Sequence, residues 1–267
     1  MSARLIFGFH AVAAKLRHDP EAVREILIDA GRHEKGDKRV RDLMGQIARH
    51  RVRLDLIDGK RLDAMLPGAR HQGVMARLEG ERKAIFIDDV LDTLETPPFL
   101  LTLDGVTDPR NLGACLRVAD GAGVHAVIAP RDRAVGLTDA AIKTACGAAE
   151  SVPYITVTNL ARTLRELKER GIHVIGAASK APQSLYAAQW PVAIAWALGA
   201  EGKGLRRLTL ETCDQHVSIP MRGSVESLNV SVAAGICLFE TCRRRMTEKD
   251  GIRGNAATGQ SHQNKMP

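Results

Sequence analysis

The stretch that decides the fold is residues 192–204, which read VAIAWALGAEGKG. Its first part, residues 192–198, is a continuous apolar run that predicts a strand buried on both faces. The part that follows, residues 199–204, holds three glycines and a single carboxylate, Glu201. A buried strand that leads into a glycine-rich loop is typical of a parallel α/β sheet, in which ligands bind beyond the carboxyl ends of the strands.

Strand and helix patterns alternate on both sides of this stretch. Further strands are expected at residues 23–28, 52–57, 73–78, 99–103, 124–129, 154–157, 172–177 and 216–219. Helices are expected at residues 10–17, 37–50, 112–122, 160–170, 205–210 and 229–245. Because strands and helices interleave, the larger, C-terminal part of the chain is predicted to be a parallel α/β sheet.

Residues 81–98 divide the chain, since they are rich in charge and end in Thr96-Pro97-Pro98, which cannot continue a regular element. We therefore expect a small α/β domain at residues 1–78, a linker at 79–97 and a larger domain at 98–246. The remaining residues, 247–267, contain almost no apolar side chains and are expected to be disordered.

The chain is basic, and the surplus is concentrated near its N-terminus. The net charge of the 267 residues is +7, and residues 1–80 carry 16 Lys and Arg against 11 Asp and Glu. Basic side chains that pair with phosphates release condensed counterions, so this surplus favours a nucleic-acid partner. Aromatic residues make up only 3% of the chain, which argues against stacking of RNA bases on a sheet of rings. An RNA partner would be held by charge and shape.

Several classes of protein are disfavoured. The apolar segments are too short to cross a bilayer, and the N-terminus lacks the apolar core of a secretory signal, so we expect a cytoplasmic protein without a membrane partner. Its cysteines form no Cys-x-x-Cys pair, and no histidines stand at a helical ligand spacing. We therefore expect no metal site and interpret the cysteines as buried free thiols.

Two glycine motifs are poor matches to dinucleotide and Walker phosphate loops. Residues 121–126, GAGVHA, have the spelling of a dinucleotide fingerprint, but they end a helix and open a strand, so we interpret them as a helix C-cap. The loop at 199–204 follows a strand correctly but does not match a Walker phosphate loop. Its glycines either make a tight turn with positive φ or let a flat ligand approach the backbone closely.

Two more polar segments follow expected strands. In residues 104–117, DGVTDPRNLGACLR, Asn111 is either the N-cap of the next helix or a site residue. Arg117 lies off the apolar stripe of that helix and is either simply exposed or a ligand for phosphate. In residues 219–230, IPMRGSVESLNV, the small polar side chains cannot all be helix caps, which leaves some free to line a site.

The three segments together resemble a known family. The sequences Asn111-Leu-Gly-Ala-x-x-Arg117, Leu198-Gly-Ala-Glu-Gly-x-Gly204 and Ile219-Pro-Met-x-Gly-Ser-x-x-Ser-Leu-Asn-Val-Ser231 are similar, in this order, to the three signatures of the SpoU (TrmH) family of RNA ribose methyltransferases. The resemblance covers nearly the whole chain except residues 247–267. Gly8-Phe-His10 and His71-Gln-Gly73 are similar to the branch that methylates a guanosine of 23S rRNA in the peptidyl-transferase region.

The resemblance implies a fold and a reaction. It implies an L30e-like RNA-binding domain followed by an α/β domain of the SPOUT type, whose C-terminal part forms a trefoil knot. It further implies a homodimer in which two protomers complete each site, with S-adenosylmethionine as the methyl donor. The expected activity is methylation of a ribose 2′-hydroxyl in 23S rRNA. The alternatives are a tRNA guanosine 2′-O-methyltransferase and an RNA-binding or ribosome-assembly protein without catalysis.

The resemblance also implies roles for individual residues. Cofactor-binding residues would be Leu198, Gly199, Gly202, Ile219 and Leu228, and catalytic residues would be Arg117, Asn111, Glu201, Ser227 and Asn229. The ribose oxygen would attack the donor methyl in line, so catalysis is mainly positioning plus removal of one proton. Because a guanidinium loses its proton too reluctantly to act as a base, we expect Arg117 to bind a phosphate and to stabilise the developing alkoxide.

Overall fold

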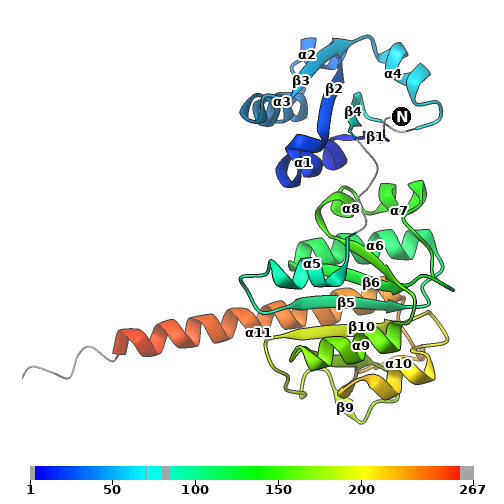
Figure 1. The fold of residues 1–267 in the computed structure, drawn as a ribbon, viewed down its shortest axis with the longest axis vertical. Coiled ribbons are helices and arrows are strands. Elements are labelled where there is room, and N and C mark those ends of the chain that lie inside the picture. Colours follow the sequence, from blue (N-terminus) through cyan, green and yellow to red (C-terminus); the bar gives the residue numbers. More distant parts are fainter. Residues whose placement is uncertain (1–3, 70, 80–84, 259–267) are drawn as a thin grey trace, which may run out of the picture.

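The computed structural model describes residues 4–69, 71–79 and 85–258, which form two α/β units, one above the other in Figure 1. The smaller unit has four strands in the order β1-β4-β2-β3, in which only β2 and β3 pair in parallel. Its elements are β1 (Arg4–Phe7), α1 (Phe9–His18), a 3-10 turn (Pro20–Ala22), β2 (Val23–Asp29), α2 (Ala30–Glu34), α3 (Lys38–His50), β3 (Arg53–Ile57), α4 (Gly59–Met65) and β4 (Val74–Leu78).

Helices cover both faces of the small sheet. On one face, α1 and α3 pack against β2 and β4, and the apolar stripe of α3 supplies three buried side chains, Val40, Leu43 and Ile47. Asp37 begins this helix, because its carboxylate accepts a hydrogen bond from the backbone N–H of Arg39. On the other face, α4 packs on Leu27 and Met75. The expected small α/β unit is therefore present.

The larger unit contains a seven-stranded sheet in the order β7-β6-β5-β10-β8-β11-β9, and every pair of neighbouring strands in it is parallel. Its elements are α5 (Ile87–Asp92), β5 (Phe99–Asp104), α6 (Pro109–Ala122), β6 (Ala126–Pro130), α7 (Asp139–Thr144), α8 (Ala148–Ser151), β7 (Tyr154–Val157), α9 (Leu160–Glu169), β8 (His173–Ala177), β9 (Gln183–Ser184), β10 (Ile194–Gly199), α10 (Arg207–Thr212), β11 (Gln215–Ser218) and α11 (Val230–Thr258). The expected parallel α/β sheet is confirmed.

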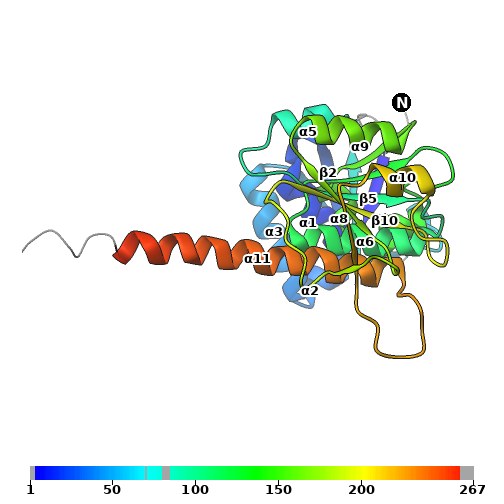
Figure 2. The same ribbon diagram turned by 90° about the horizontal axis from the view of Figure 1, so that it is seen from below.

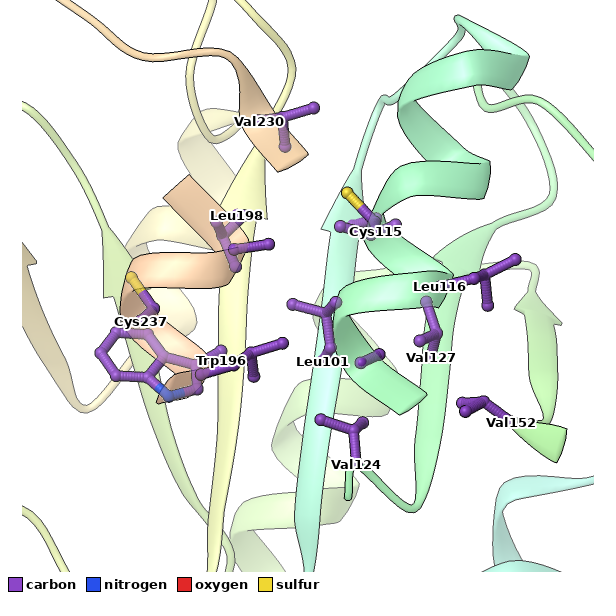
Figure 3. Close-up of a cluster of buried hydrophobic side chains, with 14 of the residues drawn as sticks. Leu101, Cys115, Leu116, Val124, Val127, Val152, Trp196, Leu198, Val230 and Cys237 are labelled. Carbon is purple, nitrogen blue, oxygen red and sulfur yellow. The ribbon is translucent and has the colours of Figure 1, made fainter. Parts of the chain in front are cut away.

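The central strands are buried on both faces, as the apolar run at 192–198 predicts. Alternate side chains of β5 and β10 point to opposite layers of the core. Trp196 and Leu198 lie in the layer beneath α6 and α11, together with Leu101, whereas Leu100 lies in the layer beneath α9. Figure 3 shows Trp196 and Leu198 beside Cys237 of α11. The two layers hold β10 in place and fix where its carboxyl end emerges.

Helix α6 begins earlier than its sequence pattern indicates. It starts at Pro109, and the carboxylate of Asp108 caps it by accepting from the backbone N–H of Arg110. The interpretation of Asn111 as the N-cap is therefore wrong, which leaves its side chain free for other contacts. At the other end, Gly123 has the left-handed conformation of a C-cap, as expected.

Two segments differ from their sequence-based expectations. A short helix, α5, lies within residues 81–98, where we expected only a connection. Helix α11 extends to Thr258, into the segment 247–267 that was expected to be disordered, and residues 259–267 lie outside the described residues.

The cysteines are free, but they are not all buried. Cys115, Cys213 and Cys237 are buried and Cys242 is half-buried, whereas Cys146 is exposed, so our interpretation is wrong for that residue. Among the described residues, no helix has the length and apolarity needed to span a membrane.

The two units touch through α1 and α8. Arg4 forms an ion pair of 2.5 Å with Glu150, whose side chain is only 2% exposed. Beside this pair, a Cβ on Gly147 would lie 2.7 Å from the carbonyl oxygen of His10, so only glycine allows the backbone of α1 to come this close. The contact places the small unit next to the turn between α7 and α8.

Candidate active site

A pocket lies at the carboxyl ends of β8, β10 and β11. Its volume is about 380 Å³, within the range of roughly 300–1,000 Å³ typical of small-molecule sites. Three connections form it: residues 177–180 after β8, residues 198–205 at the end of β10, and residues 219–228 after β11. Figure 2 shows the connection between β11 and α11 as a loop that extends away from the sheet.

All five residues expected to bind the cofactor line this pocket: Leu198, Gly199, Gly202, Ile219 and Leu228. Two of the expected catalytic residues, Glu201 and Ser227, line it as well. One further wall, formed by Ala177, Ser179 and Lys180, was not expected from the sequence. Because residues 172–177 were expected to form a strand of the same parallel sheet, its carboxyl end was the signal that could have found this wall.

The glycine loop makes the tight turn that one of its two interpretations predicts. Gly202 and Gly204 have positive φ values of 74° and 65°, so they make the tight turn. Gly199 has a different role, since a Cβ on it would lie 1.9 Å from the carbonyl carbon of Gly204. Bare backbone at Gly199 therefore lets the loop fold back onto its own strand, where Ala200 and Gly204 form a bridge.

Asn229 connects the three signature segments. Its side-chain Nδ2 donates to Oδ1 of Asn111 at 2.9 Å and to Oε2 of Glu201 at 3.4 Å. Its Oδ1 accepts from the backbone N–H of Ser231 at 2.9 Å, at the start of α11. Asn229 is therefore a helix cap that also brings together side chains far apart in the sequence, although neither Asn229 nor Asn111 is among the described residues that line the pocket.

Arg117 stands apart from this cluster. Its side chain is exposed on α6, and Nη1 lies 3.6 Å from Sγ of Cys146. Arg117 is not among the described residues that line the pocket. Within one chain, the fold thus gathers the expected cofactor residues and most of the polar ones, but leaves Arg117 outside.

The sequence of this chain matches two known protein families. Residues 98–239 match the SpoU rRNA Methylase family, and residues 5–84 match the family of RNA 2′-O ribose methyltransferase substrate-binding domains. The chain belongs to the SpoU rRNA methylase family. Both matched regions of this SpoU methylase coincide with the two units of the fold.

Relatives with described functions are similar along nearly their whole length. The 23S rRNA (guanosine-2′-O-)-methyltransferase RlmB of Bordetella pertussis is 56% identical over 91% of this chain and 98% of its own. The protein of the same name from Ralstonia nicotianae is 57% identical over 91% of this chain and 96% of its own. Among solved structures, the SpoU methyltransferase AviRb of Streptomyces viridochromogenes, in complex with AdoMet, aligns with a TM-score of 0.71 at 24% identity, over 92% of this chain and 91% of its own.

Proposed function

We propose that this SpoU methylase transfers a methyl group from S-adenosylmethionine to the ribose 2′-hydroxyl of one guanosine in 23S rRNA, in the peptidyl-transferase region. The similarity to two RlmB proteins carries this proposal, because identities of 56% and 57% extend over more than nine-tenths of both chains. All three signature segments are intact; the second and third line one pocket, and the first is joined to the third by the hydrogen bond between Asn229 and Asn111. Their integrity disfavours an RNA-binding protein without catalysis.

The residues of the pocket fit the proposed cofactor. Leu198, Ile219 and Leu228 offer apolar side chains to a flat base, and the glycine loop offers bare backbone. Glu201 is exposed at the rim and supplies a negative charge for a cationic ligand. When bound, S-adenosylmethionine supplies an electrophilic methyl group, so the chain itself needs no nucleophile.

The contribution of the protein to catalysis would be to position the reacting groups. Asn111, Glu201 and Asn229 form a hydrogen-bonded group that orients the ribose, with Ser227 next to them in the loop. Arg117 binds a phosphate beside the target nucleotide and stabilises negative charge on the attacking oxygen. A guanidinium remains protonated at neutral pH, so the proton of the hydroxyl passes to another acceptor.

We further propose that the active unit is a homodimer. Arg117 is exposed and lies outside the pocket of its own chain, so it would complete the pocket of a partner. The exposed side chains of Val232 and Phe239 on α11 provide apolar surface for such a contact. The trefoil knot of the family would involve the connections that build the pocket, from β10 through α11.

The remaining assignments concern the rest of the chain. Residues 1–78 would bind the RNA, residues 79–97 would connect the units, and residues 98–246 would carry out the transfer. Residues 247–267 receive no role. The protein would act without a metal ion, in the cytoplasm where ribosomal RNA is modified.

The substrate can be tested in the host organism. RNA from a strain that lacks this protein should have lost one 2′-O-methylguanosine from 23S rRNA, and expression of the wild-type chain should restore it. Loss of the modification from a tRNA, with 23S rRNA unchanged, would establish the tRNA alternative instead. An unaltered methylation pattern in both RNAs would contradict catalysis.

A further inference from the structure

Asp104, the last residue of β5, carries a carboxylate that the proposed reaction does not use. Its side chain has 0% exposure to solvent. Removing a charged carboxylate from water is unfavourable unless it is paired and hydrogen-bonded. Among the described residues, Arg206 meets both needs, since its backbone N–H donates to Oδ2 at 2.9 Å and its Nε donates to Oδ1 at 2.5 Å.

The same residue also holds the other end of the glycine loop. The backbone N–H of Ala200 donates to the carbonyl oxygen of Asp104 at 3.1 Å. Residues 200–206 therefore leave β10 and return to α10 with both ends bonded to Asp104. Between these ends, the N–H of Gly204 donates to the carbonyl oxygen of Ala200 at 2.8 Å, which closes the turn.

The loop has few other means of keeping its shape. Glu201, Gly202, Lys203 and Gly204 are all exposed, and Gly202 and Gly204 are the residue type with the greatest backbone freedom. Ordering such residues is opposed by conformational entropy, so they need fixed ends. The side chain of Arg206 is 42% exposed and that of Asp104 is fully buried, so the carboxylate is the more constrained partner of the pair.

We propose that Asp104 is a positioning residue for the cofactor. Through its carboxylate and Arg206, it holds residues 200–205 in the conformation that forms one wall of the pocket. Asp104 does not itself line the pocket, so its effect on binding is indirect. This inference rests on the proposed function only in the identity of the ligand, because the conformation of the loop is a property of the protein without it.

The competing explanation is that Asp104 stabilises the sheet in general. Thr102 provides a matched control, because it lies on the same strand, is fully buried, and donates from Oγ1 to the carbonyl oxygen of Trp196 at 2.9 Å. Its side chain bridges β5 and β10, whereas the carboxylate of Asp104 joins β5 to Arg206 at the end of the loop. Arg207 is the second control, because it adjoins Arg206 yet pairs with Glu211 at the surface.

The test compares Asp104→Asn and Arg206→Ala with Thr102→Val and Arg207→Ala, using the full chain. Amide hydrogen exchange without cofactor reports on the loop, titration calorimetry with S-adenosylmethionine reports the Kd, and thermal denaturation reports overall stability. We expect both loop variants to exchange faster at residues 200–205 and to raise the Kd about tenfold or more, the effect of losing a hydrogen bond to a charged group. Arg206→Lys, which keeps a charge near Asp104, should recover part of the affinity.

Each outcome is decisive. If Asp104→Asn and Thr102→Val lower the melting temperature equally but only Asp104→Asn weakens binding and exposes the loop, the positioning role is supported. If exchange at residues 200–205 is unchanged in Asp104→Asn and Arg206→Ala, the role is overturned. Should Asp104→Asn fail to fold, Arg206→Ala decides alone, since its side chain lies at the surface. A wild-type protein that binds no S-adenosylmethionine would refute the proposed function, while the exchange measurement would still decide the role of Asp104.

Discussion

The side-chain amide of Asn229 donates to the side-chain oxygen of Asn111 at 2.9 Å, across 118 positions of the sequence. The bond joins the first turn of α6 to the residue that precedes α11, and both of these helices pack on the same face of the sheet. Because Oδ1 of Asn229 also accepts from Ser231, the orientation of its amide group is fixed. Two signature segments of the family are thus held in register by one residue.

Arg117→Ala should separate catalysis from cofactor binding. Arg117 lies outside the cofactor pocket of its own chain, so the Kd for S-adenosylmethionine should change less than about twofold. The turnover rate should fall by about 10²–10³, the usual effect of removing a group that stabilises developing oxygen charge. Calorimetry and single-turnover methyl transfer measure the two quantities. An equal loss of both would contradict the role that we assign to Arg117.

Gly199→Ala should destroy the cofactor pocket. The new Cβ would lie 1.9 Å from the carbonyl carbon of Gly204, so the loop could not fold back onto its strand. We expect the Kd for S-adenosylmethionine to rise more than about tenfold. Gly223→Ala is the matched control, because its Cβ would have no neighbour within 4 Å and it lies in the other loop of the same site. Similar affinities for the two variants would show that close approach at Gly199 is unimportant.

Cys146 should be the thiol that reacts first with iodoacetamide near pH 8. Burial raises the pKa of Cys115, Cys213 and Cys237 to about 12, which keeps these thiols protonated, whereas Cys146 is exposed. Because Sγ of Cys146 lies 3.6 Å from Arg117, the adduct should block turnover. Mass spectrometry of the modified peptide, alongside the activity assay, measures both effects.

Cys146→Ser is the control for this experiment. The variant should keep most of its activity and should be insensitive to the reagent. Full activity of a protein that is completely alkylated at Cys146 would argue that this edge of α6 stays away from the substrate.

The exposed cations of α3 should contribute to RNA affinity. Three of them are changed together, in the variant Lys38→Ala, Arg41→Ala and Arg49→Ala. Loss of these charges should weaken binding of 23S rRNA fragments and lower the dependence of log Kd on log salt by about two units. The control removes three cations from α9 and its C-cap in the larger unit, in the variant Arg162→Ala, Arg165→Ala and Arg170→Ala. Equal salt dependence of the two variants would contradict RNA binding by the small unit.

Glu240 should make the free energy of unfolding depend on pH in the acidic range. Hydrogen bonds from Arg243 and then Arg244 lower its pKa from 4.5 to about 2. A carboxyl with a lowered pKa in the folded state stabilises the protein above its unfolded pKa, and this contribution is lost as the pH falls from about 4.5 toward 2. Glu240→Gln should therefore reduce the free energy of unfolding by about 2 kcal/mol at pH 7, and by about half as much near pH 3.

Urea denaturation at the two pH values measures this difference. The control is Glu211→Gln, whose carboxylate is 53% exposed and pairs with Arg207 four residues away. Its effect should be below about 0.5 kcal/mol at either pH. A pH-independent loss in Glu240→Gln would mean that packing, rather than charge, is what Glu240 contributes.

Much of the fold could be predicted from the sequence, because its central elements have strong local patterns. The apolar run that ends at Leu198 marks β10, and the stripe of Val40, Leu43 and Ile47 marks α3. The shorter helices, such as α5 and α7, have too few turns to show a period. The start of α6 was misplaced because Asp108 and Pro109 are a cap and a first-turn residue, which carry no apolar signal.

The candidate site was predictable only in part. The signature segments contain the pocket residues Gly199 and Leu228, and the structure brings these together. The carboxyl end of the expected strand 172–177 is the one signal for Ser179 and Lys180, and their place in the pocket wall follows from β8 lying between β10 and β11. The hydrogen bonds between Arg206 and Asp104 could not be predicted from the sequence, since the two residues are far apart in the chain and belong to no recognisable motif.

Methyl transfer to unmodified 23S rRNA tests the central proposal most directly. Purified protein is incubated with S-adenosylmethionine labelled in its methyl group, and the labelled nucleoside is identified after complete digestion of the RNA. We expect one 2′-O-methylguanosine per rRNA molecule, formed about 10²–10³ more slowly with Arg117→Ala. Absence of transfer from a protein that binds both the cofactor and the RNA, or label on a base instead of a ribose, would contradict it.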